Sequence, residues 1–328
     1  MTNGDALLCL RGFGRFTYEA DSPQVLPATP FDLASLTKIL ATTSMAMILY
    51  ERGEVDLEMP LATVLPEFRG DDPRRREVTF RMLLAHSSGL PAYEKLFLRA
   101  HTRAELLQLA LEIPLSADPG SRAEYSDIGF ILLGAALERI ADDSLDHFCR
   151  REVFGPLGMA GTAFTPTAEL RPTMPPTQND HTFRHRIIQG EVQDENASLM
   201  GGVAGHAGLF APAVDVARFA HCMLGGGTPI LRPETVSLFT RPESSPAGTS
   251  RALGWDTPST PSQAGQYFSP SSFGHLGYTG TSLWIDQERE LSVTLLTNRT
   301  WPDCKNQAIK QVRPRLHDAV IAAMEGKS

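Results

Sequence analysis

The stretch "FDLASLTKILATT", residues 31–43, decides how this chain folds. It places Ser35 and Lys38 three positions apart at the start of an apolar segment, which predicts a buried helix over about 34–52. Residues i and i+3 of a helix lie on one face, so the lysine nitrogen can approach the serine oxygen. The positive helix start favours a developing alkoxide, and apolar surroundings lower the pKa of a lysine. The pair is a candidate nucleophile and base, but S-x-x-K is short, and an ordinary serine and lysine remain the alternative.

Two later segments carry further candidate groups. "YSDIGFILLG" begins with Tyr125 in a polar loop before an apolar helix, where a phenol can share a proton with Lys38. The alternative is that the tyrosine packs while Ser126 or Asp127 caps the helix. "FGHLGYTGTSLWID", residues 273–286, begins a strand whose glycines let the backbone approach a ligand and offer an N–H to an oxyanion. A turn before an ordinary strand is the alternative there.

Taken together and in this order, the segments resemble the family of class C β-lactamases, D-alanyl-D-alanine peptidases and related serine esterases. That family carries S-x-x-K, then Y-x-N or a variant, then K-T-G or a variant such as H-x-G. "LLAHSSGLP" at 83–91 also reads like one of its segments, so the likeness covers nearly the whole chain.

The resemblance implies a β-lactamase/transpeptidase-like fold of mixed α and β structure (α/β, or α+β). Its antiparallel sheet is flanked by helices, a mainly helical subdomain is inserted, and the active site lies in the groove between them. We therefore expect one domain over 1–328, with an α/β region at about 1–60 plus 205–328 and a helical region at about 61–204.

Roles for individual residues also follow from the resemblance. Ser35 matches the nucleophile, Lys38 the general base, and Tyr125 the tyrosine that assists the lysine and protonates the departing group. The backbone N–H groups of Ser35 and Tyr278 match the family's oxyanion hole. Neither a cofactor nor a metal ion enters this scheme.

Two departures from the family pattern affect the substrate side of the site. Asp127 stands where many members have Asn, so an acceptor replaces a group that can donate to a substrate carbonyl. His275 and Gly277 belong to H-L-G in place of K-T-G, so a lysine and a threonine suited to a carboxylate are missing. A histidine is at most partly cationic near neutral pH. We expect Asp127, His275 and Gly277 to contact the substrate, and β-lactamase activity to be weak or absent.

The segment "DENASLMGGVAGHAGLF", residues 194–210, suits a pocket-lining loop because glycines surround His206. It resembles a segment of a subgroup that includes amidases removing peptide from N-acetylmuramic acid. A peptidoglycan fragment (muropeptide) is therefore a candidate substrate and His206 a candidate contact, with a structural loop histidine as the alternative.

These features predict a serine hydrolase that forms an acyl-enzyme on Ser35 and cleaves a small-molecule ester or amide. The alternative is a catalytically slow, penicillin-binding-like protein that binds or senses its ligand, which the changes at Asp127 and His275 favour.

Composition narrows the function classes further. A chain of 328 residues with 42% hydrophobic residues can bury a sizeable core, and its net charge of −8 disfavours nucleic acid as a partner. The apolar stretches are broken well short of a membrane span. The first residues lack the pattern of a signal peptide, which predicts a cytoplasmic protein, or a periplasmic one if a leader was removed.

Periodicity predicts the remaining elements. Apolar runs around Arg-Gly-Phe-Gly in "ALLCLRGFGRFTYEA" indicate an N-terminal hairpin, and "SLWID" with "LSVTLLTN" indicates a late one. The predicted helices are 103–113, 128–141, 145–154 and 306–324, and the predicted long surface loop is 165–198. Family members usually have a helix before the first strands. We therefore expect the last helix to be exposed on its apolar face or covered by another subunit in a homodimer.

Overall fold

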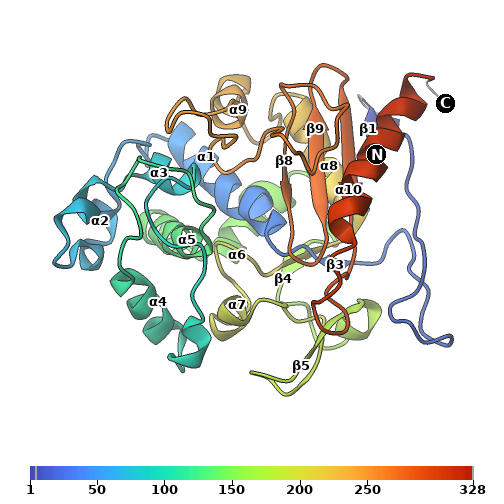
Figure 1. Cartoon of the computed structure of the whole chain (residues 1–328), viewed down its shortest axis with the longest axis horizontal. Helices are drawn as coiled ribbons and strands as arrows, with labels where there is room; N and C mark the ends of the chain where they lie inside the picture. Colours follow the sequence, from blue (N-terminus) through green and yellow to red (C-terminus); the bar gives the residue numbers. More distant parts are fainter. Residues whose placement is uncertain (4–5, 327–328) are drawn as a thin grey trace.

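The structure, a computed structural model, describes residues 1–3 and 6–326. A five-stranded antiparallel sheet stands beside a mainly helical region (Figure 1). The strand order is β2-β1-β10-β9-β8, so strands from both ends of the chain share one sheet. The strands are β1 (Thr2–Asn3), β2 (Ala6–Leu7), β8 (Phe273–Leu276), β9 (Ser282–Asp286) and β10 (Leu291–Leu295).

Alternation along β9 explains how the sheet is covered on both faces. Leu283 and Ile285 join the main core with Phe219 of α8, whereas Trp284 joins a second cluster with Ile321 of α10. Successive side chains of a strand point to opposite faces, so the two helices cover opposite sides of the sheet. The bounds are α8 (Ala213–Leu224) and α10 (Ile309–Met324). The predicted late hairpin and closing helix are confirmed, although the helix begins three residues later than predicted.

The predicted helix at 34–52 is confirmed, with helical residues at 36–51 and almost every side chain buried. Its first part is a π-helix (Lys38–Thr43) that continues into α1 (Ser44–Glu51). Such π segments are often found at functional sites. The other helices are α2 (Leu61–Val64), α3 (Phe80–Leu84), α4 (Arg103–Glu112), α5 (Asp127–Ala141), α6 (Leu145–Cys149), α7 (Glu195–Leu199) and α9 (Pro233–Thr240).

Helix α5 runs through the helical region beside α1 (Figure 1). Nine of its 15 residues are buried, as an almost fully apolar sequence requires. Ser126 caps its start by accepting a hydrogen bond from the Gly129 N–H at 2.9 Å. This cap fixes the residues on either side of it, Tyr125 and Asp127.

The predicted N-terminal hairpin around Arg-Gly-Phe-Gly is wrong. The first strands pair Thr2 with Leu7, and in the described residues between β2 and β3 the only pairing is an isolated bridge from Arg15 to Gln24. Several of its apolar side chains stay exposed, with Phe13 78% and Tyr18 77% exposed, although Phe16 is buried.

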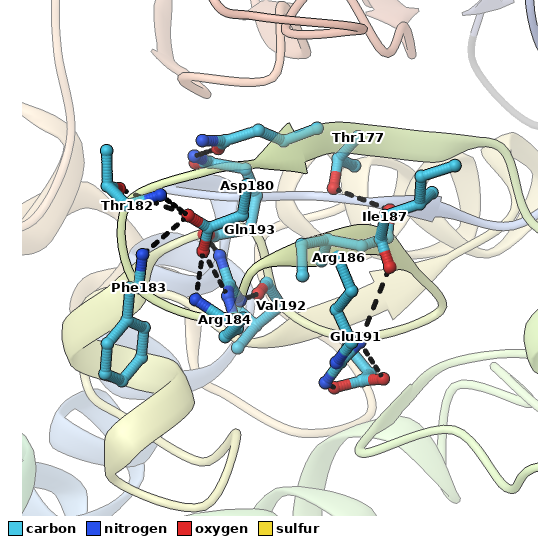
Figure 2. Close-up of polar contacts among 12 residues, drawn as sticks. Thr177, Asp180, Thr182, Phe183, Arg184, Arg186, Ile187, Glu191, Val192 and Gln193 are labelled. Carbon is cyan, nitrogen blue, oxygen red and sulfur yellow. Dashed lines mark hydrogen bonds and ion pairs between the residues drawn. The ribbon is translucent and has the colours of Figure 1, made fainter.

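The predicted surface loop at 165–198 is also wrong, because it contains a hairpin of β5 (Pro176–Asp180) and β6 (Arg186–Gln189), followed by α7. Figure 2 shows that polar groups hold it. The fully buried Asp180 carboxylate accepts the Phe183 N–H and the Arg184 guanidinium, which also donates to the carbonyls of Val192 and Gln193. Because polar contacts hold this hairpin, its sequence does not alternate between apolar and polar residues. A prediction from periodicity therefore does not find its strands.

A second, three-stranded sheet has the order β3-β7-β4, and its first strand ends at Asp32, three residues before Ser35. Its strands are β3 (Phe31–Asp32), β4 (Ala163–Phe164) and β7 (Leu209–Ala211). In the described residues, no helix combines the length and apolar character needed to cross a membrane.

Candidate active site

A tight turn after β3 presents Ser35. Ala34 adopts a left-handed backbone conformation with φ of 47°, and helical residues begin at position 36. The Asp32 carboxylate accepts the Ala34 N–H at 2.8 Å and the Gln193 N–H at 2.6 Å. Burial raises the pKa of Asp32 to about 6, against the hydrogen bonds it accepts. A buried carboxylate thus ties the turn that carries Ser35 to the 190–194 segment.

Two side chains, Lys38 and Tyr125, contact the Ser35 hydroxyl, and Asp127 contacts both of them. Lys38 Nζ lies 3.1 Å from Ser35 Oγ, 2.6 Å from Asp127 Oδ1 and 3.0 Å from the carbonyl oxygen of His206. The Tyr125 hydroxyl lies 2.8 Å from Ser35 Oγ and 3.2 Å from Asp127 Oδ1. The structure therefore brings Ser35, Lys38, Tyr125 and Asp127 together.

Burial makes the charged form of Lys38 less stable than in water, although one neighbour opposes this. The lysine side chain is fully buried, and burial lowers its pKa while the Asp127 carboxylate raises it, with a net lowering. A neutral amine has two N–H groups, one each for Asp127 and the His206 carbonyl, and its lone pair then faces Ser35. Burial, followed by the charge of Asp127, raises the pKa of Tyr125 well above its usual value, so the phenol keeps its proton.

Two residues that line the cavity, Ser35 and Tyr278, have backbone N–H groups without a protein acceptor among the described residues. Among the hydrogen bonds of residues 1–3 and 6–326, neither the Ser35 N–H nor the Tyr278 N–H donates to a protein acceptor. Thr279 and Thr281 lock the two segments together, because their hydroxyls donate to the carbonyls of Asp32 and Leu33 at 2.8 and 2.9 Å. The pair can act as an oxyanion hole.

Close approach of these segments requires Gly277. A Cβ at this position would overlap the Thr281 hydroxyl and the Leu33 carbonyl. The Gly277 carbonyl accepts a hydrogen bond from the buried Arg313 guanidinium at 2.6 Å. Gly277 thus lines the site through its backbone.

His275 is uncharged in this setting. Its ring is 2% exposed, and burial, aided by the charges of Lys38 and Arg251, lowers its pKa to about 3. Nδ1 lies 2.8 Å from the Leu276 carbonyl, which can only accept, so Nδ1 carries the proton. Its Nε2 has no partner among the described residues and is left as a free acceptor.

His206 contributes to the site mainly through its backbone, since its carbonyl accepts from Lys38. Its ring is 1% exposed and pairs through Nε2 with Asp194 Oδ1 at 2.8 Å. Burial alone would raise the pKa of Asp194, but the His206 ring lowers it below its usual value. Asp194 also caps α7 through the Ala197 N–H.

A cavity of about 800 Å³ opens over Ser35 in the groove between the sheet and the helical region. It is lined by all the predicted site residues except the buried Lys38. Sequence reasoning missed several other lining residues, namely Tyr93, Gln178, Gln193, Asp194, Arg251 and Asp256. Asp194 begins the 194–210 segment that the sequence singles out, whereas the other five belong to no motif, and long-range packing brings them to the cavity. Within the described ranges, no group of three or more His, Cys, Asp or Glu side chains could hold a metal ion.

Comparison with known proteins gives a consistent result. A family model described as Beta-lactamase matches residues 3–313. A Bacillus subtilis (strain 168) protein named N-acetylmuramyl-L-alanine amidase is 32% identical over 303 residues, covering 83% of this chain and 68% of its own. An Escherichia coli (strain K12) protein, provisionally named a D-alanyl-D-alanine carboxypeptidase, is 32% identical over 303 residues, covering 83% and 69%.

Solved structures share the fold. EstCE1, described as a hydrolase with promiscuous acyltransferase activity, superposes with a TM-score of 0.75 over 94% of this chain and 88% of its own. The sequence identity is 23%, so this likeness concerns the fold alone.

Proposed function

This chain belongs to the beta-lactamase family, and from that membership we propose that it cleaves an ester or amide bond through an acyl-enzyme on Ser35. The family resemblance, the fold class and the assignment to the hydrolases that the sequence predicts are confirmed. Ser35 as nucleophile, and the substrate, are the proposal.

One observation carries the proposal: Ser35 Oγ lies within hydrogen-bonding distance of both Lys38 Nζ and the Tyr125 hydroxyl. With Lys38 neutral, every polar group in the cluster has a partner. Tyr125 donates to Ser35, Ser35 donates to the Lys38 lone pair, and Lys38 donates to Asp127 and the His206 carbonyl. This arrangement meets the need of a serine nucleophile for an adjacent base.

The reaction begins when Ser35 Oγ attacks the substrate carbonyl carbon and passes its proton to Lys38. The free N–H groups of Ser35 and Tyr278 receive the oxyanion, and such a donor typically contributes about 3 kcal/mol to barrier lowering. When the tetrahedral intermediate collapses, Tyr125 gives its proton to the departing oxygen or nitrogen and regains one from the Lys38 ammonium. Water then attacks the acyl-enzyme, and the same groups move its proton to Ser35.

Asp127 acts here as a positioning residue. Its Oδ1 accepts from Lys38 at 2.6 Å and lies 3.2 Å from the Tyr125 hydroxyl, so one carboxylate oxygen is close to both proton carriers. The sequence predicts that Asp127 contacts the substrate, and it does line the cavity. We place its main effect on Lys38, through charge and orientation.

We propose a peptidoglycan fragment as the substrate class. The amidase relative and the similarity of the 194–210 segment support this choice. The cavity also exceeds what a short acyl group needs, since pockets of about 300 to 1,000 Å³ hold drug-sized ligands. An N-acetylmuramyl-L-alanyl peptide left intact by active enzyme would remove this substrate class. The uncharged His275 supports weak or absent β-lactamase activity, and efficient penicillin turnover would contradict that.

A second candidate function is a binding or sensing protein with slow turnover. The 2.6 Å contact between Lys38 and Asp127 favours it, because the carboxylate stabilises the ammonium form, which cannot accept a proton. Labelling by a fluorophosphonate without turnover of any ester would support this function.

The direct test of catalysis compares hydrolysis of 4-nitrophenyl acetate by the wild type and Ser35→Ala. We expect turnover by the wild type that is lost in the variant. Equal rates in the two proteins would contradict the role of Ser35.

We also propose a homodimer that covers the exposed apolar side chains of the closing helix α10. Val312 and Met324 on this helix are 47% and 43% exposed. Pairing of two copies would cover such apolar groups. Sedimentation of a single species of 35.8 kDa at high concentration would contradict this.

A further inference from the structure

The positively charged side chains that line the cavity differ in how many of their N–H groups already donate hydrogen bonds to the protein. They are Lys95, Arg251, Arg299, Lys310 and Arg313. Arg313 is buried and donates to the carbonyls of Gly277, Gly280 and Thr281. Arg299 donates to the carbonyls of Tyr278 and Cys304. Both arginines are therefore committed to the backbone around the oxyanion hole.

Lys95 and Lys310 are exposed to solvent, whereas Arg251 lies close to the reacting groups. Its guanidinium carbon is 5.5 Å from the centroid of the Tyr125 ring, and its side chain is 22% exposed. A cation held over an aromatic face is partly desolvated, which strengthens its interaction with an anion.

The hydrogen bonds of Arg251 leave one edge of its guanidinium open. Nη1 pairs with the Asp256 carboxylate. Within the part of the chain that the structure describes, Nε and Nη2 donate to no acceptor. These two N–H groups lie side by side on one edge of the planar group, the geometry that binds a carboxylate through two parallel hydrogen bonds.

The neighbouring ring of His275 cannot supply this positive charge. It is buried, its Nδ1 proton is used by the Leu276 carbonyl, and its Nε2 atom is also buried, with no partner among the described residues. The positive charge beside Tyr125 therefore comes from Arg251, whose Nε and Nη2 form the open edge of the guanidinium.

We propose that Arg251 binds a carboxylate on the leaving group of the substrate. This inference rests on the proposed function, in which Tyr125 protonates the leaving group, because Arg251 lies against the Tyr125 ring. A carboxylate next to the departing oxygen or nitrogen would reach Nε and Nη2.

The competing explanation is that Arg251 only neutralises Asp256. Asp256 also lines the cavity, with 18% of its side chain exposed, and an unpaired carboxylate there would repel an anionic substrate. Replacing Arg251 alone would then weaken anion binding because Asp256 is left unpaired, and not because a contact between Arg251 and the substrate is lost. A double replacement of Arg251 and Asp256 removes both charges and separates the two explanations.

The test uses two acetyl esters that differ only in the charge of the leaving group, 3-acetoxybenzoate and 3-acetoxybenzamide. The kcat/KM ratio of acid to amide is measured for the wild type, Arg251→Gln, Arg251→Lys and Arg251→Gln/Asp256→Asn. Arg122→Gln is the matched control, because this exposed arginine pairs, among the described residues, only with Glu124 and lies outside the cavity lining.

We expect the wild type and Arg122→Gln to prefer the acid. Arg251→Gln lowers the ratio by about tenfold or more, since a charge-assisted bidentate contact is lost, while amide turnover changes little. Arg251→Lys keeps the positive charge but lacks the two parallel N–H donors of the guanidinium, so we expect an intermediate ratio. The double variant stays as low as Arg251→Gln.

Two results would overturn the inference alone, provided that Ser35-dependent turnover of the amide ester persists: a wild type with no preference, or a double variant that recovers the preference. Absence of Ser35-dependent turnover of either ester would overturn the proposed function and this inference together.

Discussion

Lys38 Nζ lies 2.6 Å from Asp127 Oδ1 and 3.1 Å from Ser35 Oγ, so the lysine contacts a carboxylate more closely than the hydroxyl it is to deprotonate. The ammonium form of Lys38 is stabilised by Asp127 and destabilised by burial, and burial prevails. Where a catalytic base sits between two such influences, its neighbour sets the pH at which it works.

Replacing the Asp127 carboxylate should move the acid limb of the pH dependence of kcat/KM. Asp127→Asn removes the charge that raises the pKa of Lys38, so the neutral amine persists to lower pH. We expect the acid limb of kcat/KM to shift downward, measured with 4-nitrophenyl acetate. An unchanged limb would mean that another group controls it. Asp71→Asn, at an exposed position, serves as the control for the loss of one charge.

Loss of the Tyr125 hydroxyl should affect substrates unequally. A 4-nitrophenolate departs without a proton, whereas an amine needs one, so Tyr125→Phe should impair amide cleavage more than ester cleavage. General acid catalysis contributes about 10²- to 10⁴-fold, which sets the expected loss for an amide. Equal losses for the two substrates would show that the phenol acts mainly on Ser35 and Lys38.

The Asp32 carboxylate should make stability depend on pH in a defined window. Its pKa in the folded chain is about 6, against an ordinary 3.8, so the folded state binds more protons than the unfolded state between these values. The stability from this group is full below about pH 3.8 and is lost as pH rises through about 6. Asp32→Asn should lack this component, as urea unfolding at several pH values would reveal. Identical pH slopes in variant and wild type would contradict it.

The β5–β6 hairpin should matter for large substrates only. Arg184→Ala leaves the fully buried Asp180 carboxylate without its cation, which typically costs about 3 to 5 kcal/mol. The hairpin carries Gln178 and Thr182 of the cavity wall. We expect kcat/KM to fall for a muramyl peptide but not for 4-nitrophenyl acetate. The exposed Arg186→Ala, on the same hairpin, provides the matched comparison.

Sequence patterns anticipate the elements whose signal is local. The apolar run after Ser35 gives a buried helix, and the alternation of β9 and β10 gives the late hairpin. The β5–β6 hairpin escapes because the Asp180 carboxylate, rather than apolar alternation, holds its turn. The N-terminal prediction fails for the opposite reason, since residues such as Phe13 have an apolar pattern but no surface to cover.

The site divides in the same way. Ser35, Lys38 and Tyr125 lie in short motifs, and the structure places Lys38 Nζ and the Tyr125 hydroxyl within hydrogen-bonding distance of Ser35 Oγ. Arg251 lies in no motif, and it reaches the cavity because the segment after α9 packs against Tyr125. A residue that reaches the site only through long-range packing cannot be recognised as a site residue from a single sequence.

The central claim, an acyl-enzyme on Ser35, is tested most directly by trapping it. The protein is mixed with excess 4-nitrophenyl acetate, quenched in acid during turnover, and analysed by intact mass and peptide mass spectrometry. We predict one added acetyl group on the peptide containing Ser35, which disappears as substrate is exhausted and does not form in Ser35→Ala. Turnover by the wild type with no adduct on that peptide, or an adduct in Ser35→Ala that forms and decays at the same rate, would contradict the account.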